Sequence, residues 1–381
     1  MKPVDCWTDP YAYLDQQLQQ QPRVIDFPGN QKYLADVEDA QHVLTNAEGY
    51  FNPEHSDFFY IQGRYLGPRE VQQDIGRSAI RFLNQYSEQH KTRLTELTAK
   101  WVSDGTSWPD NGNWLFYHYF KDALLGNARS KYSHQLLKWV VQRSVCSGAK
   151  LSYPNWQRRL FSTFVKVEFS RQIKKAQQQK ESGQVRDIID ILVVACPADY
   201  PAEDLCEIYL SFVFACIGSV GFTLGWSLYL LGSNPDAEHK ASYVVREALR
   251  LWPVAWNLGR QPQQSYELAG HQITPEHMVV ACPYAVHRNP KYWTEAVKFQ
   301  PERWASADSQ TPFLAFGWGE HKCVAAALSM RLVELVLLQL QSYRIKIDDS
   351  GLRPLAQPAL APAPFVLWLV PRSDTEVKCQ R

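Results

Sequence analysis

The sequence lacks a strong excess of either charge. Its 40 Lys and Arg residues balance 39 Asp and Glu residues, which leaves a net charge of +1. Because nucleic-acid binding needs a concentrated basic face, this balance argues against a nucleic-acid partner. The first residues, Met1-Lys2-Pro3-Val4-Asp5, also lack the apolar segment of a signal peptide. We therefore expect a cytoplasmic protein without an N-terminal membrane anchor.

Cysteine is scarce, with eight residues in 381, and none of the eight belongs to a C-x-x-C pair. The missing pair argues against zinc-ribbon and thioredoxin-like sites. So low a cysteine content also argues against a disulfide framework and predicts reduced thiols. A single cysteine could still serve as a metal ligand.

Aromatic residues, by contrast, are plentiful, at 13% of the chain with 13 Trp. Together with 45% apolar and 21% charged residues, they indicate a globular protein with a large core. Apolar residues at helical spacing predict helices over 69–102, 186–197, 238–252 and 324–341. Short runs between turn residues predict strands at 266–268, 272–274, 277–282 and 365–370. The expected fold class is mainly α with a small β region.

Only one apolar run is long. Ile208 to Leu231 holds 24 residues without a charge. As a helix it would measure about 36 Å, which is long enough to span a membrane. Glycines at 218, 221 and 225 and several hydroxyl residues lower its hydrophobicity, and it lies in the middle of the chain. We favour a helix at the centre of a large soluble domain, with a membrane span as the alternative.

A loop that contains glycines leads to a cysteine. The residues PFLAFGWGEHKC end at Cys323 and run directly into a predicted helix. The free amides of the first helical turn and the positive end of the helix dipole favour a thiolate there. A buried thiolate is a suitable axial ligand for haem iron. For a lone cysteine, however, a role as a small apolar residue is the commoner interpretation.

The residues around the cysteine favour the interpretation of Cys323 as a ligand of haem iron. Phe316-Gly317-x-Gly319-x-His321-x-Cys323 resembles the haem-binding signature of the cytochrome P450 family, although the family's glycine two residues later is Ala325 here. The resemblance implies a cytochrome P450 fold in a single domain over residues 1–381, best matched over 203–371. It also implies haem b as the cofactor, Cys323 as the ligand of its iron, and Phe316 and Gly317 as neighbours of the haem.

Two further motifs agree with this family in order and spacing. Glu247-x-x-Arg250 matches the family's Glu-x-x-Arg, whose two residues share one helix face. Arg303, in Pro301-Glu302-Arg303-Trp304, matches the arginine that precedes the cysteine loop. The resemblance implies that these three residues form a structural triad, which is not catalytic. His287, in a segment similar to the family's His-Arg-x-Pro, is either a core histidine or a haem contact.

Haem propionates need Arg, Lys or His partners. The resemblance implies His321 and Arg260 as two such anchors, with His90 or Arg93 as a third. Lys322 would lie on the surface where an electron donor of the ferredoxin or flavodoxin type docks.

The long apolar segment lacks the acid of the family's acid–alcohol pair. Alignment on the segment's end, from Trp226 to Pro235, places the pair on Gly218 and Ser219. In the family these groups relay protons during oxygen activation. Ser219 keeps an alcohol, and Thr223 would replace it if the register differs by one turn. Gly218 either allows a close approach of the backbone or marks altered oxygen chemistry.

These features predict a haem-thiolate oxidoreductase of specialised metabolism that acts on a small apolar or aromatic molecule. The expected reaction is monooxygenation, or oxidative radical coupling of phenolic or aryl substrates, which tolerates a missing proton relay. Peroxide-driven and isomerase or dehydratase chemistry are alternatives within the family. The alternative of another class is a non-catalytic haem-binding or recruitment protein with the same fold.

Overall fold

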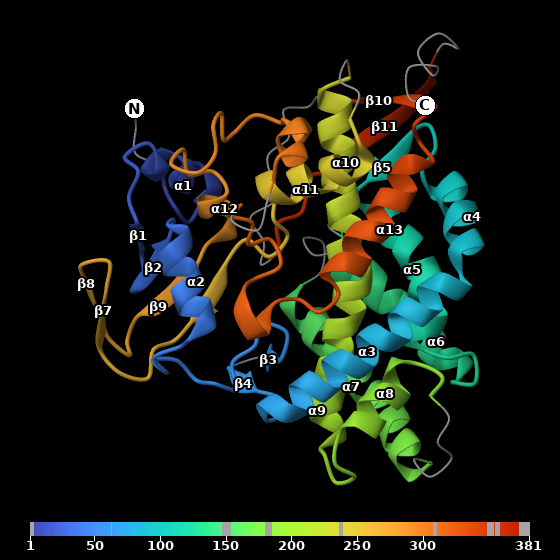
Figure 1. Ribbon diagram of the computed structural model, residues 1–381. Helices are drawn as coiled ribbons and strands as arrows, with labels where there is room; N and C mark the ends of the chain where they lie inside the picture. Colours follow the sequence, from blue (N-terminus) through green and yellow to red (C-terminus); the bar gives the residue numbers. More distant parts are fainter. Residues whose placement is uncertain are drawn as a thin grey trace. The chain divides into compact units, whose positions relative to one another are not determined.

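The computed structural model describes residues 4–61, 63–146, 154–179, 185–235, 239–307, 311–348, 354 and 359–372 (Figure 1). The chain falls into two compact units, each assembled from three separate segments. The first unit comprises Met1–Asp57, Asp236–Ala326 and Pro354–Ala361. The second comprises Phe58–Pro235, Ala327–Arg353 and Pro362–Arg381.

The first unit is built around a four-stranded sheet with the order β1-β2-β9-β6. β1 (Val24–Phe27) and β2 (Gln31–Leu34) form an antiparallel hairpin that sequence patterning did not predict. Its turn uses Gly29 and Asn30, both with positive φ, as hairpin turns require. β9 (Met278–Ala281) runs parallel to its partner β2, and β6 (Leu258–Arg260) runs antiparallel to β9.

Short helices and a second hairpin complete this unit. Residues 241–251 form an amphipathic helix, α11, which buries eight side chains and ends just before Pro253. The other elements are α1 (Pro10–Leu18), α2 (Val37–Thr45), β7 (Tyr266–Leu268), β8 (His271–Ile273), α12 (Pro283–Val286) and the 3-10 turns η4 (Pro301–Ala305) and η5 (Gly319–His321).

The second unit is mainly helical. Its helices are α3 (Arg69–Gln89), α4 (Lys91–Trp101), α5 (Asp110–Leu124), α6 (Lys131–Val140), α7 (Asn155–Gln178), α8 (Ile188–Ala195), α9 (Ala202–Val213), α10 (Val220–Ser233) and α13 (Ala326–Leu338), which enters the unit at Ala327. Two π-helical turns, η1 (Val141–Val145) and η3 (Phe214–Ser219), extend α6 and α9. The strands are β3 (Tyr60–Ile61), β4 (Arg64–Tyr65), β5 (Thr106–Trp108), β10 (Tyr343–Ile347) and β11 (Phe365–Pro371).

The long apolar run is the central helix of the second unit. It continues from α9 through η3 into α10, where ten of fourteen residues are buried. Ala202–Ser233 is the one stretch among the described helices that is long and apolar enough to span a membrane. Its most apolar window is 67% buried in protein, as in the core helix of a soluble domain.

Glycines allow α5 and α10 to cross closely. A Cβ atom on Gly221 would lie 2.4 Å from Oδ1 of Asn113, and one on Gly112 would lie 2.9 Å from the Gly221 carbonyl oxygen. Neither position can hold a larger residue without separating the two helices. The mainly α fold class with a small β region is confirmed, and within the second unit α10 packs closely against α5.

Candidate functional site

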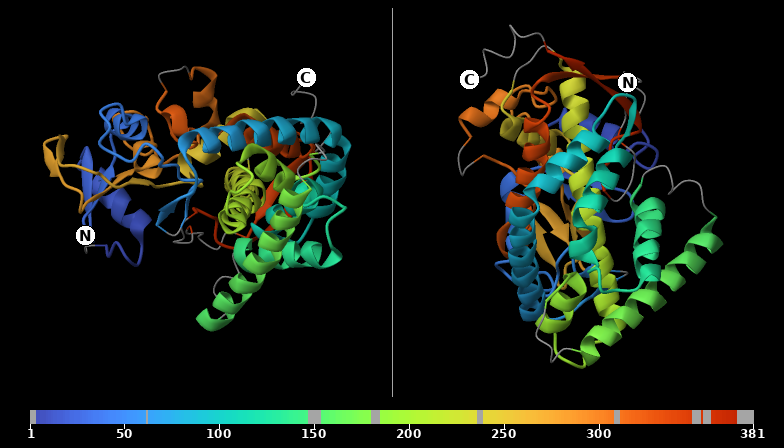
Figure 2. Two further views of the ribbon diagram at one scale, coloured as in Figure 1. Left: turned by 90° about the horizontal axis from the view of Figure 1, so that it is seen from below. Right: turned by 90° about the vertical axis from the view of Figure 1, so that its right-hand side faces the viewer.

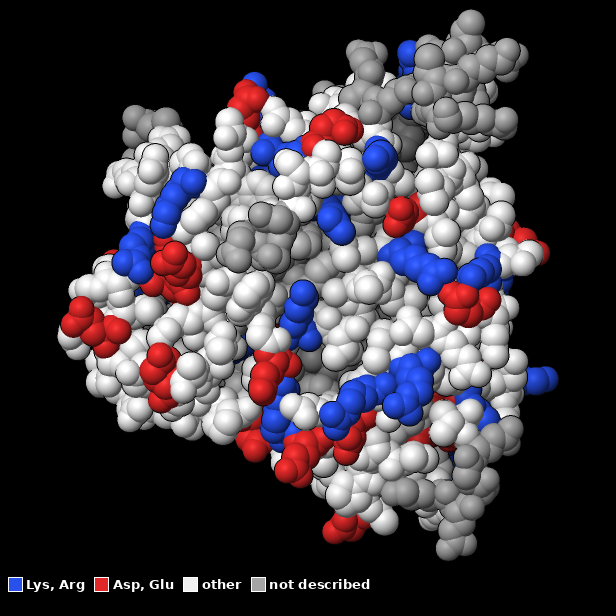
Figure 3. All heavy atoms as spheres, in the orientation of Figure 1, with Lys and Arg blue, Asp and Glu red and all other residues white. Residues whose placement is uncertain are grey.

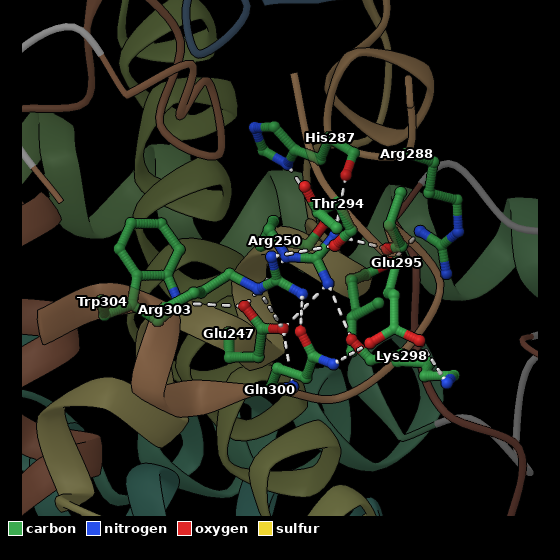
Figure 4. A network of polar contacts seen from close by, with 12 residues as sticks. Glu247, Arg250, His287, Arg288, Thr294, Glu295, Lys298, Gln300, Arg303 and Trp304 are labelled. Carbon is green, nitrogen blue, oxygen red and sulfur yellow. Dashed lines mark hydrogen bonds and ion pairs between the residues drawn. The ribbon is translucent and has the colours of Figure 1, made fainter. Parts of the chain in front are cut away.

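A buried polar network in the first unit is centred on α11 (Figure 4). Glu247 and Arg250 are both fully buried. Nε and Nη2 of Arg250 donate to the two carboxylate oxygens of Glu247 at 2.9 and 2.8 Å. Nε of Arg303, from η4, donates to Oε1 of Glu247 at 3.2 Å. The structure thus brings the three residues of the sequence-derived triad into direct contact.

The remaining polar atoms of this network also have partners. Nη1 of Arg250 donates to the carbonyl oxygens of His287 and Ala296, and Nη2 donates to that of Lys298. Glu247 further accepts from the indole of Trp304 at 2.9 Å and the Gln300 amide at 3.0 Å. All five N–H groups of the guanidinium are therefore satisfied. A buried ion pair is tolerated when its hydrogen bonds are this complete.

His287 connects the triad to the cysteine loop. Its ring is fully buried, Nε2 accepts from the Leu314 amide at 2.7 Å, and Nδ1 lies 3.2 Å from the Arg250 carbonyl oxygen. Burial lowers the pKa of His287 to about 3, so the ring is neutral. Because an amide donates to Nε2, the proton is on Nδ1 and is donated to Arg250. His287 is thus a core histidine that positions the start of the loop.

Two glycines shape the loop itself. Gly317 and Gly319 have φ values of +74° and +66°, which residues with a side chain rarely adopt. The loop closes through hydrogen bonds from the Gly317 amide to the Leu314 carbonyl at 2.9 Å and from the Cys323 amide to the Phe316 carbonyl at 2.8 Å. The spacing Phe-Gly-x-Gly therefore has a local structural cause.

Cys323 is the exposed cysteine among the seven within the described residues, and the other six are buried. The pKa of its thiol is raised, because burial by surrounding protein outweighs a hydrogen bond from the Ala325 amide and the charge of Lys322, which both lower it. The Ala325 amide belongs to the turn that leads into α13. The residue as a whole is exposed, and its thiol already has an amide partner of the kind that stabilises a thiolate, which fits a ligand of haem iron.

The predicted anchor Arg260 has a partner of its own. From β6 it binds Asp57 through two hydrogen bonds of 2.9 and 3.1 Å, and it is 3% exposed. Burial would raise the pKa of Asp57, but Arg260 and His55 outweigh it and lower that pKa to about 2. Sequence reasoning missed Asp57, which has no motif and lies 203 residues from Arg260. His321, the other predicted anchor, is half-buried at the end of η5.

The other predicted anchors lie in the second unit. Arg93, on α4, donates to Asp122 of α5 at 2.7 Å and to the His118 carbonyl at 2.6 Å. His90 stacks on Tyr86 with 4.0 Å between ring centroids, and its Nδ1 lies 2.8 Å from the Tyr86 carbonyl oxygen. Arg93 thus joins α4 to α5, and His90 packs against α3. Their role at a propionate stays a prediction.

Gly218 and Ser219 close the π turn η3. A Cβ atom on Gly218 would lie 2.9 Å from the Phe214 ring and 3.0 Å from Cγ1 of Val145, so a carboxylate side chain there would displace its neighbours. The hydroxyl of Thr223 donates to the Ser219 carbonyl at 2.8 Å and is therefore occupied within the helix. Single π turns inside α-helices are frequent at functional sites.

Comparison with known proteins places these motifs in a family context. The family model described as Cytochrome P450 matches residues 241–367. The chain is 28% identical over 226 residues to cytochrome P450 3A5 of Homo sapiens, covering 49% of this chain and 43% of that protein. It is 28% identical over 200 residues to cyclooctatin synthase of Streptomyces melanosporofaciens, covering 45% of this chain and 44% of that protein. The matches therefore span less than half of these relatives.

Solved structures resemble the chain over nearly its whole length. Cytochrome P450 TbtJ1 matches with a TM-score of 0.74 and 15% identity, over 97% of this chain and 99% of that chain. HmtN, a post-tailoring hydroxylase involved in himastatin biosynthesis, matches with a TM-score of 0.73 and 14% identity, over 94% and 97%. At such identities the likeness establishes a common fold.

Proposed function

Because this chain belongs to the cytochrome P450 family and has its fold, we propose that it is a haem-thiolate oxidoreductase that acts on a small apolar or aromatic molecule. The observation that carries the proposal is Cys323, an exposed residue whose thiol has the Ala325 amide as a partner. It ends a loop that His287 and two glycines with positive φ hold in place. Members of the family bind haem b, which supplies the oxidising chemistry when bound.

Residues of the first unit would hold the haem. Cys323 would ligate the iron, and Phe316 and Gly317 would place the loop beside the porphyrin. His321 and Arg260 would bind propionates through charge-assisted hydrogen bonds. Arg260 would have to share its guanidinium between a propionate and Asp57, and the five donors of an arginine allow both.

The activity would be monooxygenation or oxidative coupling, as part of specialised metabolism. Cyclooctatin synthase and the himastatin hydroxylase are relatives whose names support that setting. The π turn favours chemistry that does not depend on an acidic side chain, because Phe214 and Val145 fill the space beside Gly218. Ser219 would supply the remaining hydroxyl for proton transfer in monooxygenation, and coupling of phenolic or aryl substrates would not require it.

An acidic ferredoxin or flavodoxin would supply electrons in the cytoplasm. On the face shown in Figure 3, Lys and Arg side chains gather over α3, with acidic side chains beside them. Arg77 and Arg81 on α3 and Arg331 on α13 are exposed. Such a surface attracts an acidic partner through long-range electrostatics.

The absorption spectrum of the reduced, carbon monoxide-bound protein tests the proposal. We expect the red-shifted Soret band of a thiolate-ligated haem in the wild type and in Cys6→Ser, a matched control at another cysteine. Cys323→Ser should lose that band. A band typical of histidine ligation in all three proteins, or no haem in any, would overturn the assignment.

Turnover separates the enzyme from the alternative of another class, a non-catalytic haem-binding or recruitment protein. With the band present, we expect consumption of small aromatic substrates in the presence of reductant and electron donor, or of peroxide. Haem binding without consumption of oxygen or peroxide would favour the non-catalytic protein.

A further inference from the structure

A long segment of the second unit contains no acidic residue. Residues 123–167 hold eight Lys and Arg but neither Asp nor Glu. The rest of the chain, with 32 Lys and Arg against 39 Asp and Glu, has a net charge of −7. A nearly neutral protein thus concentrates its positive charge in one region, which contains α6, η1 and the first half of α7. Uneven charge of this kind indicates an anionic partner.

The same segment concentrates exposed apolar side chains. Six of the fourteen large apolar residues that are exposed among the described residues lie here: Tyr132, Trp139, Trp156, Leu160, Phe164 and Val167. The last four are 65%, 51%, 55% and 63% exposed. Because they follow one another at intervals of four, four and three residues on α7, they share one face of that helix.

The first half of α7 extends beyond the helices around it. No residue from 154 to 164 is buried, and the buried residues of α7 begin at Val165. Figure 2 shows the long green helix reaching outward from the second unit. In proteins most helical stability comes from packing an apolar face, so an unpaired stretch of this kind indicates a surface that will cover it.

Several cations of the segment are free to bind anions. Arg158 and Arg159 on α7 and Lys131 and Lys138 on α6 are exposed, and none of these four has an ion pair within the described residues. Lys166, by contrast, pairs with Glu207 of α9. Arg143 lies over the Phe161 ring at 4.8 Å, so it also lies at this surface. By contrast, Arg129 is buried against Asp187 and Asp190 and belongs to the core.

We propose that this surface, formed by α6 and residues 155–167 of α7, binds an anionic lipid bilayer. Exposed Trp, Phe, Leu and Val side chains would enter the boundary between headgroups and acyl chains, and the flanking arginines and lysines would contact lipid phosphates. This combination of a basic face with aromatic and aliphatic residues is typical of helices that lie in a membrane interface. The attachment is peripheral and does not depend on the proposed haem chemistry.

Charge decides against a second copy of the chain as the occupant. Two copies would bring the exposed cations Lys131, Lys138, Arg158 and Arg159 of one against the same four of the other, with no acidic residue of this segment between them. Water alone would leave the apolar face of α7 exposed. An anionic bilayer can pair with the cations and also cover the apolar face, because it offers negative headgroups and an apolar interior within one surface.

Flotation of the full-length protein with vesicles tests the proposal. We expect binding to phosphatidylcholine vesicles that contain phosphatidylglycerol, little binding to pure phosphatidylcholine, and release by about 0.5 M salt, which screens charges beyond a few ångströms. Arg158→Glu/Arg159→Glu and Trp156→Ser/Phe164→Ser should each weaken binding by at least about tenfold. Matched controls with exposed residues elsewhere, Lys100→Glu/Lys346→Glu and Trp7→Ser/Val297→Ser, should bind as the wild type does.

A second readout locates the contact. Brominated lipids should quench tryptophan fluorescence in the wild type, and Trp156→Phe should remove the larger part of that quenching. Equal binding by all variants would overturn the proposal. So would binding that salt does not release, which would point to Ala202–Ser233. A lack of vesicle binding, together with a complex with an acidic protein, would overturn it in favour of a protein partner.

Discussion

At the scale of single residues, His287 has the clearest energetic role. It receives the Leu314 amide on one side and donates to the Arg250 carbonyl on the other, so it joins the triad to the cysteine loop through one neutral ring. Both bonds require the neutral form with the proton on Nδ1. Protonation would remove the acceptor and place a charge beside Arg250 in the protein interior.

This residue should therefore make the protein less stable as the pH decreases. Its pKa is about 3 in the folded protein against an ordinary value of 6.5, so the unfolded chain binds a proton below pH 6.5 that the folded protein does not. Between pH 7 and pH 5 this costs about 2 kcal/mol of unfolding free energy. In His287→Gln, stability at pH 7 should decrease, and its dependence on pH should weaken by about that amount.

Urea unfolding at the two pH values measures both effects. His42→Gln, a surface substitution on α2, serves as the control and should keep the wild-type dependence. If His287→Gln also keeps the wild-type pH dependence of stability, the assignment of a neutral, buried ring to His287 is wrong.

The residue scale also shows what the sequence could predict. Cys323, Glu247, Arg250 and Arg303 stand in motifs, because their chemistry fixes their spacing. Asp57 belongs to no sequence motif. Its ion pair with Arg260 joins residues that lie 203 positions apart, so it depends on the tertiary fold and not on local spacing. The role of His287 was left open, because burial and ring partners are properties of the folded protein.

At the scale of elements, the π turn η3 interrupts an otherwise regular helix. Periodicity predicted one helix over 208–231, since a single extra residue in a turn hardly changes an apolar pattern. The break between α3 and α4 was also missed, because it consists of the single residue His90 with apolar residues at helical spacing on both sides. The β1–β2 hairpin was missed because its strands have only four residues each, with polar residues among them.

Packing beside the π turn predicts that substitutions of Gly218 and Phe214 have coupled effects on stability. Alanine in place of glycine favours a helix by about 1 kcal/mol, yet Gly218→Ala should destabilise the protein, since overpacking costs about 1–3 kcal/mol. Phe214→Ala should remove most of that cost, so the two changes should be strongly non-additive. Urea unfolding of the two single variants and the double variant measures the coupling.

Ser219→Ala, which leaves the Cβ atom in place, is the control and should change stability by less than about 0.5 kcal/mol. Additive effects of Gly218→Ala and Phe214→Ala would contradict close contact at this turn.

At the scale of the whole molecule, charge distribution matters more than net charge. A net charge of +1 predicted no particular partner, because composition averages over the surface. The structure places exposed cations over α3 and α13, and others over α6 and α7. The prediction of a single domain over 1–381 stays a prediction beside the two units that the contacts define.

Reduction by an acidic ferredoxin should depend on the first of these two groups. Arg77→Glu/Arg81→Glu should slow reduction of the protein by about tenfold at low salt, and high salt should diminish the difference. Stopped-flow kinetics over a range of salt concentrations measures this. Arg158→Glu/Arg159→Glu is the matched control on the other group. Equal slowing by both variants would indicate a non-specific effect of net charge.

The interleaved order of the two units has a consequence for biosynthesis. β2 is flanked by β1 on one side and β9 on the other, and Tyr33 pairs with Val280. As the ribosome extends the chain, the free edge of β2 must wait for 243 further residues before its partner strand begins. An unpaired strand edge can join other chains and aggregate. The amount of protein that a cell obtains should therefore depend on elongation speed and on chaperones that shield this edge until Met278–Ala281 is made.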